Sequence, residues 1–338
     1  MRTSRMEGCT VLGALSVTAG VRDALTIVHG PSGCAHHNFS LLHATLQQDE
    51  VQRVPRVVST DLTEDDIIFG GEGALEDTIR NAQKEDISGI FVLTTCIVDT
   101  IGDDAAALCR KTWEVPVVHI PAAGFLGGGF NRGMHNALLA LAERGRKQEK
   151  IVGAVNLIGE KNLEYEVDEN FAEISRLLGN LGATIHLRFI RDVTMSELEE
   201  VSRSSLNILR EPEITPLGNH LERRFRTPFV DRFPQGFSGT LSFLTDVSLF
   251  LGFDSEEIQN EEAERQEKIR ESFGDIAGLE VSFGDHPQTS FLTEMAGLLD
   301  FRIGREGIAL PVPVPEPVGT KGVERLFHQW RRTIRAAL

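Results

Sequence analysis

The chain has 338 residues, 41% of them hydrophobic, and a formal net charge of −16 at pH 7. Such a length ordinarily divides into two or three domains, and the excess of acidic residues argues against nucleic acid as a partner, because nucleic-acid affinity depends on Lys and Arg. Four widely spaced cysteines argue against a disulfide-rich secreted domain, the N-terminus lacks the apolar segment of a signal peptide, and no apolar run approaches the ~20 residues of a membrane helix. We therefore expect a soluble, cytoplasmic protein.

The first predicted segment leads to a glycine-rich loop that presents a thiol. Residues 9–25 are small and apolar, with a spacing compatible with a helix. Residues 25–28 are predicted to form a strand, which ends at the turn-forming sequence HGPSG at 29–33. The two glycines allow close backbone approaches, and the proline stiffens the turn. We expect Cys34 on a tight loop, facing a metal cluster, a substrate or the protein's own core.

Strands and helices alternate from this loop to about residue 148. Residues 89–95 (GIFVLTT) are typical of a buried parallel strand, and they end at Cys96. Further strands are predicted at 55–59 and 115–120. A helix is predicted at 39–48, and another follows the glycine-rich loop and ends at residue 142. This alternation predicts a doubly wound α/β domain, whose ligands bind beyond the carboxyl ends of the strands. Cys34 and Cys96 both follow such ends.

The same pattern restarts after a polar linker at 144–150. Strands are predicted at 151–158, 184–190 and 205–209, and helices at 168–181, 195–201 and 240–251. A charged segment at 255–271 predicts a solvated helix, followed by a strand at 279–283 and helices at 288–298 and 323–337. We expect three domains, at 1–148, 149–253 and 254–338, the third of them abbreviated.

No nucleotide-binding motif is found. The P-loop pattern G-x-x-x-x-G-K-S/T is absent, and the glycines at 124–133 do not fit G-x-G-x-x-G. We expect this loop, through Gly124 and Phe125, to approach a cofactor or a neighbouring domain. If nucleotide hydrolysis drives the chemistry, another protein performs it.

The cysteines fall into two groups. Cys109 lies within a predicted helix and is expected to be a small buried hydrophobe, as free cysteine often is. Cys9 follows a glycine, and Cys34 and Cys96 follow strands, so all three are candidates to meet at one edge. Three thiolates without a C-x-x-C pair do not suit a structural zinc site but suit an iron–sulfur cluster completed by another chain.

Histidines near the thiol loop are candidates for chemistry. His36 and His37 could act as metal ligands, proton donors or polar residues at the rim of the loop. His29, directly after a strand, is expected to be a hydrogen-bonded structural residue. We assign proton donation to His36 and His37, and cofactor contacts to Gly33 and to His286, which also lies in a loop past a predicted strand.

The order of these motifs resembles a known family. Cys9, HGPSGC, TDLTEDDIIFGG, and TTC followed by IGDD look like the N-terminal half of nitrogenase component 1 and its relatives, which include the dark-operative protochlorophyllide and chlorophyllide reductases. The motif match covers about residues 7–133. Beyond them, the likeness rests on domain order and on loops such as PQGFSG and FGDHPQT.

The resemblance implies three Rossmann-like α/β/α domains with parallel sheets, and it implies that Cys9, Cys34 and Cys96 ligate an iron–sulfur cluster at a subunit interface. No distal cysteine matches a ligand of the iron–molybdenum cofactor, because every cysteine lies before residue 110. Within the family, the length and the motifs look most like the catalytic subunits of Ni-sirohydrochlorin a,c-diamide reductive cyclases, which act in biosynthesis of the nickel tetrapyrrole coenzyme of methanogens.

That likeness implies a homodimeric oxidoreductase with a [4Fe-4S] cluster at the dimer interface. A homodimer would present six matched cysteines, three from each copy, and these are also compatible with a larger nitrogenase-type cluster. It implies an ATP-hydrolysing iron protein as electron donor and a nickel tetrapyrrole as substrate, with no nucleotide bound by this chain. The alternatives are another nitrogenase-like reductase, a scaffold for metallocofactor assembly, or a redox-silent tetrapyrrole-binding protein.

Overall fold

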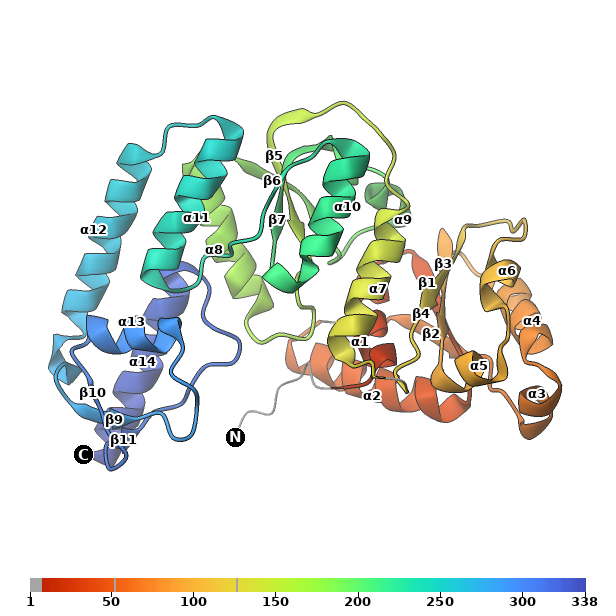
Figure 1. Ribbon diagram of the computed structural model, residues 1–338, viewed down its shortest axis with the longest axis horizontal. Coiled ribbons are helices and arrows are strands. Elements are labelled where there is room, and N and C mark those ends of the chain that lie inside the picture. The colour runs from red at the N-terminus through yellow and green to blue at the C-terminus, as the bar shows by residue number, and fades with distance from the viewer. Residues whose placement is uncertain (1–7, 52, 126) are drawn as a thin grey trace. The chain divides into compact units, whose positions relative to one another are not determined.

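The computed structural model describes residues 8–51, 53–125 and 127–338 (Figure 1). The chain forms two compact units: unit 1 contains the residues up to Val167 together with His186–Phe229, and unit 2 contains Asp168–Ile185 together with Val230–Leu338. Within the described ranges, no helix is both long enough and apolar enough to cross a membrane.

Unit 1 begins with a four-stranded parallel sheet. Its strands are β1 (Ala24–His29), β2 (Arg56–Ser59), β3 (Gly89–Thr94) and β4 (Val117–Pro121), in the order β2-β1-β3-β4. The chain passes outward from β1 to β2 and then crosses back to β3 on the other side of β1. The direction of winding therefore reverses between β1 and β3, which is where α/β sheets commonly bind ligands.

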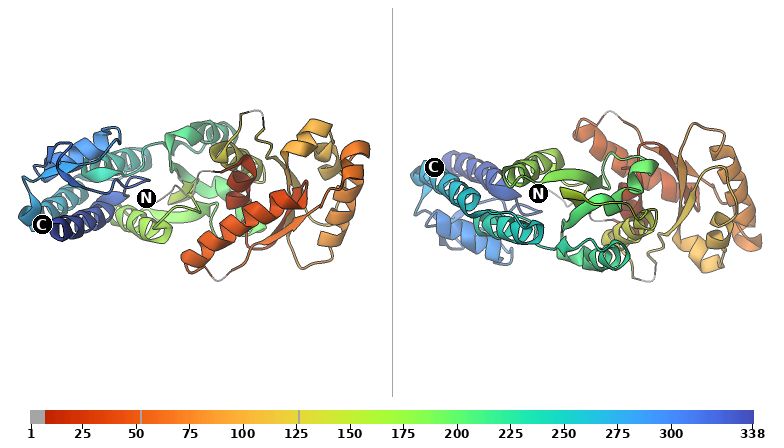
Figure 2. Two further views of the ribbon diagram at one scale, coloured as in Figure 1. Left: turned by 90° about the horizontal axis from the view of Figure 1, so that it is seen from below. Right: turned by 90° about the horizontal axis from the view of Figure 1, so that it is seen from above.

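Helices cover both faces of this sheet (Figures 1 and 2). On one face, α4 (Glu72–Ala82) and α6 (Ala105–Cys109) pack against apolar side chains of β1 and β3. On the other face lie α1 (Thr10–Thr18), α2 (Ser32–Gln48) and α7 (Phe130–Ala142). Two short helices, α3 (Glu64–Phe69) and α5 (Cys96–Ile101), pack together near the carboxyl ends of the strands. Every residue of β1 and β3 is buried, as their apolar sequences predict.

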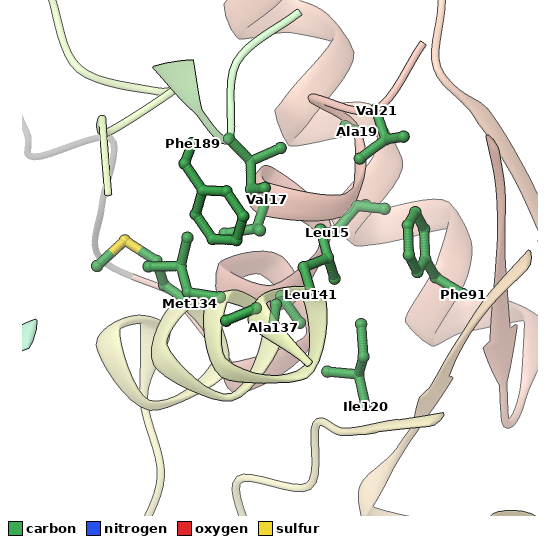
Figure 3. Packing of buried hydrophobic residues seen from close by; sticks show 14 of the residues in the cluster. Leu15, Val17, Ala19, Val21, Phe91, Ile120, Met134, Ala137, Leu141 and Phe189 are labelled. Atoms are coloured by element: carbon green, nitrogen blue, oxygen red, sulfur yellow. The ribbon is translucent and has the colours of Figure 1, made fainter. Parts of the chain in front are cut away.

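Helices α1 and α7 cross with their backbones in contact. A Cβ on Gly13 would lie 1.9 Å from the carbonyl oxygen of Phe130, and a Cβ on Gly133 would lie 1.8 Å from that of Thr10. Only glycine fits at both positions of the crossing. Apolar side chains surround it and fill the space up to the sheets (Figure 3), among them Leu15, Val17, Phe91, Ile120, Met134, Ala137, Leu141 and Phe189.

The second sheet repeats the topology of the first. Its strands are β5 (Ile151–Ile158), β6 (Thr184–Phe189), β7 (Ser204–Leu209) and β8 (Phe229–Val230), in the order β6-β5-β7-β8. Strands β5 and β7 are parallel neighbours, with Ile158 opposite Leu209. The winding thus reverses between β5 and β7, as it does between β1 and β3.

Two connections in this region differ from the sequence prediction. The helix expected at 195–201 ends early, as α9 (Met195–Leu198), and a short 3-10 helix follows at Val201–Arg203. Helix α10 (Thr215–Phe225), which was not predicted, buries Leu217, Leu221 and Phe225 on one side. This i, i+4, i+8 spacing is the sequence signal that identifies it.

Unit 2 combines helices with a small parallel sheet. The sheet has the order β10-β9-β11, from β9 (Glu280–Ser282), β10 (Arg302–Ile303) and β11 (Ile308–Ala309). The helices are α8 (Val167–Asn180), α11 (Gly236–Leu251), α12 (Glu256–Ser272), α13 (Ser290–Leu298) and α14 (Gly319–Ala337). Aromatic side chains of Phe273, Phe327 and Trp330 lie at the centre of its core.

The predicted α/β class with parallel sheets is confirmed, and the third sheet has only short strands, in agreement with an abbreviated third lobe. Helix α12 is less solvated than its charge suggested, because it buries Glu262, Gln266 and Ile269. Arg176 of α8 makes two hydrogen bonds to Glu262, of 2.8 and 2.7 Å, which satisfies the buried carboxylate. The domain boundaries at 148 and 253 stay a prediction.

Candidate metal centre

Three of the four cysteines lie at the starts of helices. Cys9 is the N-cap residue of α1, Cys34 lies in the first turn of α2, and Cys96 is the first residue of α5. The expectation that Cys34 stands on a tight loop was wrong, because α2 begins directly after Pro31 and Cys34 lies in its first turn. Proline suits the start of a helix, where its missing N–H costs no hydrogen bond.

The carboxyl ends of β1 and β3 bring the Cys34 and Cys96 segments together. His29 pairs with Thr94 at the last position of the two strands. One residue further on, the backbones approach so closely that a Cβ on Gly30 would lie 2.1 Å from Oγ1 of Thr95. Glycine at position 30 therefore lets the two cysteine-bearing segments meet at the point where the winding of the sheet reverses.

A buried amide joins Cys9 to Cys34. Asn38, on α2, donates from Nδ2 to the carbonyl oxygen of Cys34 at 2.7 Å and accepts at Oδ1 from the Cys9 thiol at 3.2 Å. Its side chain is buried. Asn38 thus fixes the start of α1 against the first turn of α2, a role that the sequence did not indicate.

The glycine-rich loop approaches the third cysteine. The backbone N–H of Gly124 donates to Sγ of Cys96 at 3.3 Å. A Cβ on Gly124 would lie 2.5 Å from Oγ1 of Thr10, the residue after Cys9. Gly124, expected to approach a cofactor, therefore contacts two of the cysteine-bearing segments, and its N–H favours a thiolate at Cys96.

The electrostatics also show that the three thiols are neighbours. Burial, and then the nearby Cys9 and Cys96 groups, raises the pKa of the Cys34 thiol. Holding three thiolates here therefore needs positive charge, which bound metal ions supply. Cys109 differs: burial in the core under α6 raises its pKa to about 12, in agreement with the expected structural role.

The donor set does not fit a single metal ion. A single tetrahedral ion with ~2.3 Å metal–sulfur bonds needs sulfur atoms about 3.8 Å apart, and among the described residues no group of three or more His, Cys, Asp or Glu side chains is placed to hold one. A multi-iron cluster needs its thiolates farther apart. The Oγ1 atoms of Thr10 and Thr95 are buried without a hydrogen-bond partner in the described part of the chain. These hydroxyls, each beside a cysteine, fit a group bound between Cys9, Cys34 and Cys96.

The remaining predicted site residues are less enclosed. His36 and His37 are exposed on the first turns of α2, and Gly33 is exposed with open space around it. Phe125 is 81% exposed. His286 is exposed and belongs to unit 2, whereas the three cysteines belong to unit 1. Their proposed roles stay predictions.

His29 lies beneath this edge in a hydrogen-bonded network, as expected. Its Nδ1 is 3.0 Å from Oγ1 of Thr60, and its Nε2 is 3.5 Å from a carboxylate oxygen of Asp103. Burial lowers the pKa of His29, although Asp103 acts in the opposite direction. The same Asp103 oxygen accepts from the backbone N–H of Gly71 at 3.0 Å. This network ties the α3–α4 turn to the sheet.

Comparison with known proteins places this site in a family. The family model of the nitrogenase component 1 type oxidoreductases matches residues 9–299. The chain belongs to this family. Membership confirms the resemblance inferred from the motifs and the oxidoreductase character of the family. It does not identify a particular reaction.

Individual relatives in this family carry different names. The chain is 29% identical to the nitrogenase iron-molybdenum cofactor biosynthesis protein NifE of Methanococcus maripaludis over 89% of this chain and 65% of that protein. It is 29% identical to the nitrogenase molybdenum-iron protein alpha chain of Methanothermococcus thermolithotrophicus, over 78% of this chain and 58% of that protein. The chain thus spans less than two thirds of these relatives.

A solved nitrogenase structure, "Nitrogenase Cp1 at pH 5", has the same fold. It superposes with a TM-score of 0.67 and 22% sequence identity, covering 88% of this chain and 63% of that one. The likeness confirms the nitrogenase-like α/β fold.

Proposed function

We propose that this chain is the cluster-bearing component of an ATP-dependent, two-component reductase that reduces and cyclises Ni-sirohydrochlorin a,c-diamide. The observation that carries the proposal is the meeting of Cys9, Cys34 and Cys96 at three helix starts around one edge of the first sheet. Helix N-termini favour negative charge, which suits thiolates and an anionic cluster.

In this proposal the three cysteines of each protomer hold a [4Fe-4S] cluster at the interface of a homodimer, and a second copy of the chain completes the ligands. When bound, the cluster supplies one-electron transfer. The protein supplies the thiolates, the amide of Asn38 that positions Cys9 and Cys34, and the Gly124 N–H at Cys96.

The choice of a tetrapyrrole rests on the resemblance of the motifs to the nitrogenase-like tetrapyrrole reductases, and the positions of the cysteines agree with it. All four lie at or before position 109, so a thiolate that would bind a second metallocofactor farther along the chain is absent from the sequence. A substrate that brings its own metal and ring needs no such thiolate. The protein then acts on the ring by binding, orientation and proton supply.

The electron donor of this proposal is an ATP-hydrolysing iron protein, because the chain has no phosphate-binding motif of its own. Helix α3 offers a contact surface for it: Ile68 is 70% and Phe69 is 85% exposed. Helix α3 packs against α5, which begins with Cys96. Exposed apolar side chains next to the proposed cluster site are more typical of a docking surface for a partner than of ordinary surface residues.

A second candidate function is a scaffold on which a metallocofactor is assembled. The relatives named as iron-molybdenum cofactor biosynthesis proteins favour it, since one from Clostridium pasteurianum is 30% identical over 73% of this chain. A scaffold and a reductase both bind a cluster, so the cluster alone does not separate them.

Turnover separates these functions. The protein is purified without oxygen, its iron and acid-labile sulfide are measured, and it is incubated with nickel sirohydrochlorin diamide, the iron protein, ATP and dithionite. A reductase forms the cyclised product, and Phe69→Ser lowers the rate while iron content stays the same. An iron-loaded protein that binds the ring without product refutes the reductase function and supports the scaffold; an iron-free protein after reconstitution refutes both.

A further inference from the structure

Helix α2 presents a long exposed surface to solvent. Of its 17 residues, those that are buried lie along one side of the helix: Ala35, Asn38, Leu42 and Thr45. Another side is exposed along the whole helix, at Gly33, His37, Ser40, Leu41, Ala44 and Gln48. Because neighbours in this second set are one, three or four residues apart, the six residues form one continuous stripe on the helix. We call them the α2 stripe.

The absence of charge from α2 is unusual for this chain. Asp, Glu, Lys and Arg make up 25% of the sequence, but none of them occurs in residues 24–48. Among the helices of nine or more residues that the structure describes, α1 shares this property, and α1 is buried throughout. A helix face that stays in water normally carries charged residues, whereas charged residues are depleted at the centre of protein interfaces. The α2 stripe therefore has the composition of a surface that a partner covers.

Apolar and aromatic side chains contribute to this surface. Leu41, in the middle of the stripe, is 44% exposed. On the same helix the rings of Phe39 and His43 stack, with their centroids 5.6 Å apart and an angle of 6° between their planes. Both of these side chains are partly exposed, so they widen the uncharged surface. Covering Leu41 and the two rings removes apolar area from water, which stabilises association.

The position of the stripe indicates a second copy of the chain as the partner. Gly33 directly precedes Cys34, and His37 lies in the next turn of the helix. Three thiolates from one chain leave a cluster open to a further ligand, so the molecule that completes the cluster lies against the start of α2. In the proposed homodimer this molecule is the second copy. Each copy has a net charge of −16, so two copies repel one another, and an uncharged face is where they approach at the lowest cost.

We propose that the α2 stripe is the surface through which two copies of this chain associate, so that the stripe of each copy is covered by the other. This inference rests on the proposed function and adds the surface that the homodimer uses. Association through the stripe brings the second copy to the Cys34 end of α2, where the cluster needs it. Contacts farther along the helix, at Leu41 and Ala44, hold the two copies together without ligating metal.

The test introduces one negative charge into the stripe. Leu41→Glu and Ala44→Glu place a carboxylate on the exposed side of α2, ~10 and ~15 Å along the helix from Cys34. Leu139→Glu is the matched control, because Leu139 lies on α7 and is also 44% exposed. The proteins are purified without oxygen and loaded with iron. Their mass is measured by light scattering over a range of concentrations, together with iron content and helical circular dichroism.

We expect Leu41→Glu to raise the dissociation constant of the dimer by on the order of 100-fold, because an unpaired carboxylate is then buried in the interface. Ala44→Glu should act in the same direction, and both variants should keep the helical content of the unmodified protein. Leu139→Glu should dimerise like the unmodified protein. The inference is overturned if both stripe variants have dissociation constants within about twofold of the unmodified value. Equal weakening by Leu139→Glu overturns it too, as does an iron-loaded unmodified protein that is a monomer.

The inference and the proposed function can fail separately, because mass and iron content do not depend on turnover. If the unmodified protein forms no product from nickel sirohydrochlorin diamide, the proposed function is refuted. The surface still stands in that case if Leu41→Glu disrupts the dimer and Leu139→Glu does not. If Leu41→Glu dimerises normally but no longer forms product with the iron protein, the stripe is a contact for the iron protein, and the inference is overturned.

Discussion

Single residues decide how the cysteine site is held together. Asn38 is the clearest case, because its side-chain amide donates to the Cys34 carbonyl and accepts from the Cys9 thiol. A buried amide with two partners fixes the relative position of the segments that it joins. The thiols therefore depend on a neighbour that is not itself a metal ligand.

Replacement of Asn38 should weaken the site. Asn38→Ala leaves the Cys34 carbonyl without this donor and frees Cys9, which should cost roughly 1–3 kcal/mol of stability. We expect less iron per protomer after reconstitution and a lower midpoint in urea unfolding. Ser40→Ala, at an exposed position of the same helix, is the control and should retain full iron content.

The thiols should also differ in reactivity. With a pKa of about 12, the Cys109 thiol stays protonated at pH 8, so iodoacetamide should not label it in the folded, cluster-free protein. Cys9 is exposed and should be labelled. Mass spectrometry of tryptic peptides distinguishes the sites, and labelling of Cys109 should appear only in denaturant. Folded-state labelling of Cys109 faster than Cys9 would contradict the assignment.

Among the single residues of the cysteine site, some could be predicted from the sequence and others could not. Strand ends and glycines identified Cys34 and Cys96, because these signals are local in the chain. The role of Asn38 depends on contacts between distant segments, for which periodicity carries no information. His36 and His37 stood out only through their closeness in sequence to Cys34.

Among the elements, the crossing of α1 and α7 has the greatest effect on the site. Cys9 caps α1, and the glycine-rich loop leads into α7. Contact between the two backbones therefore sets the separation of Cys9 from Gly124. Small residues at a helix crossing permit this approach, and any Cβ opposes it.

A matched pair of glycine substitutions tests the crossing. Gly133→Ala places a Cβ against the Thr10 carbonyl, so the backbones must separate, at a cost of about 1–3 kcal/mol or more. Gly73→Ala, within α4, meets nothing within 4 Å and should be neutral or stabilising. Urea unfolding measures both. Equal stability of the two variants would show that the helices adjust without cost.

Strands with a long continuous apolar run were predicted well from the sequence. The buried runs of β3 and β5 match their predicted ranges to within one residue. The buried side of α12 could not be read from its charge, because a carboxylate is buried only when a distant Arg176 satisfies it. The short strands β10 and β11 have two residues each, too few for a periodic signal.

For the whole molecule, the proposed homodimer raises the question of how two copies would share a cluster. Three thiols in one chain leave a cluster open toward another ligand. The proposed homodimer satisfies this need with a second copy. Cluster binding and dimer formation should then be thermodynamically linked.

This linkage can be measured on the intact chain of 37.3 kDa. The iron-loaded protein should have twice this mass in light scattering, and removal of iron by a chelator should weaken the dimer. Cys34→Ala should behave like the iron-free protein, whereas Cys109→Ala should behave like the unmodified one. A dimer that is equally stable with and without iron would place the cluster away from the interface.

The two sheets with one strand order have a consequence for how this chain could change over time. Cys9, Cys34 and Cys96 lie at the edge of the first sheet, whereas Lys161, Glu164, Arg210 and Glu211 follow β5 and β7 of the second. Substitutions at residues 159–164 and 210–211 therefore leave every thiolate in place. Under the proposed function, substrate specificity would then be free to diverge through the second sheet while the cluster site is retained.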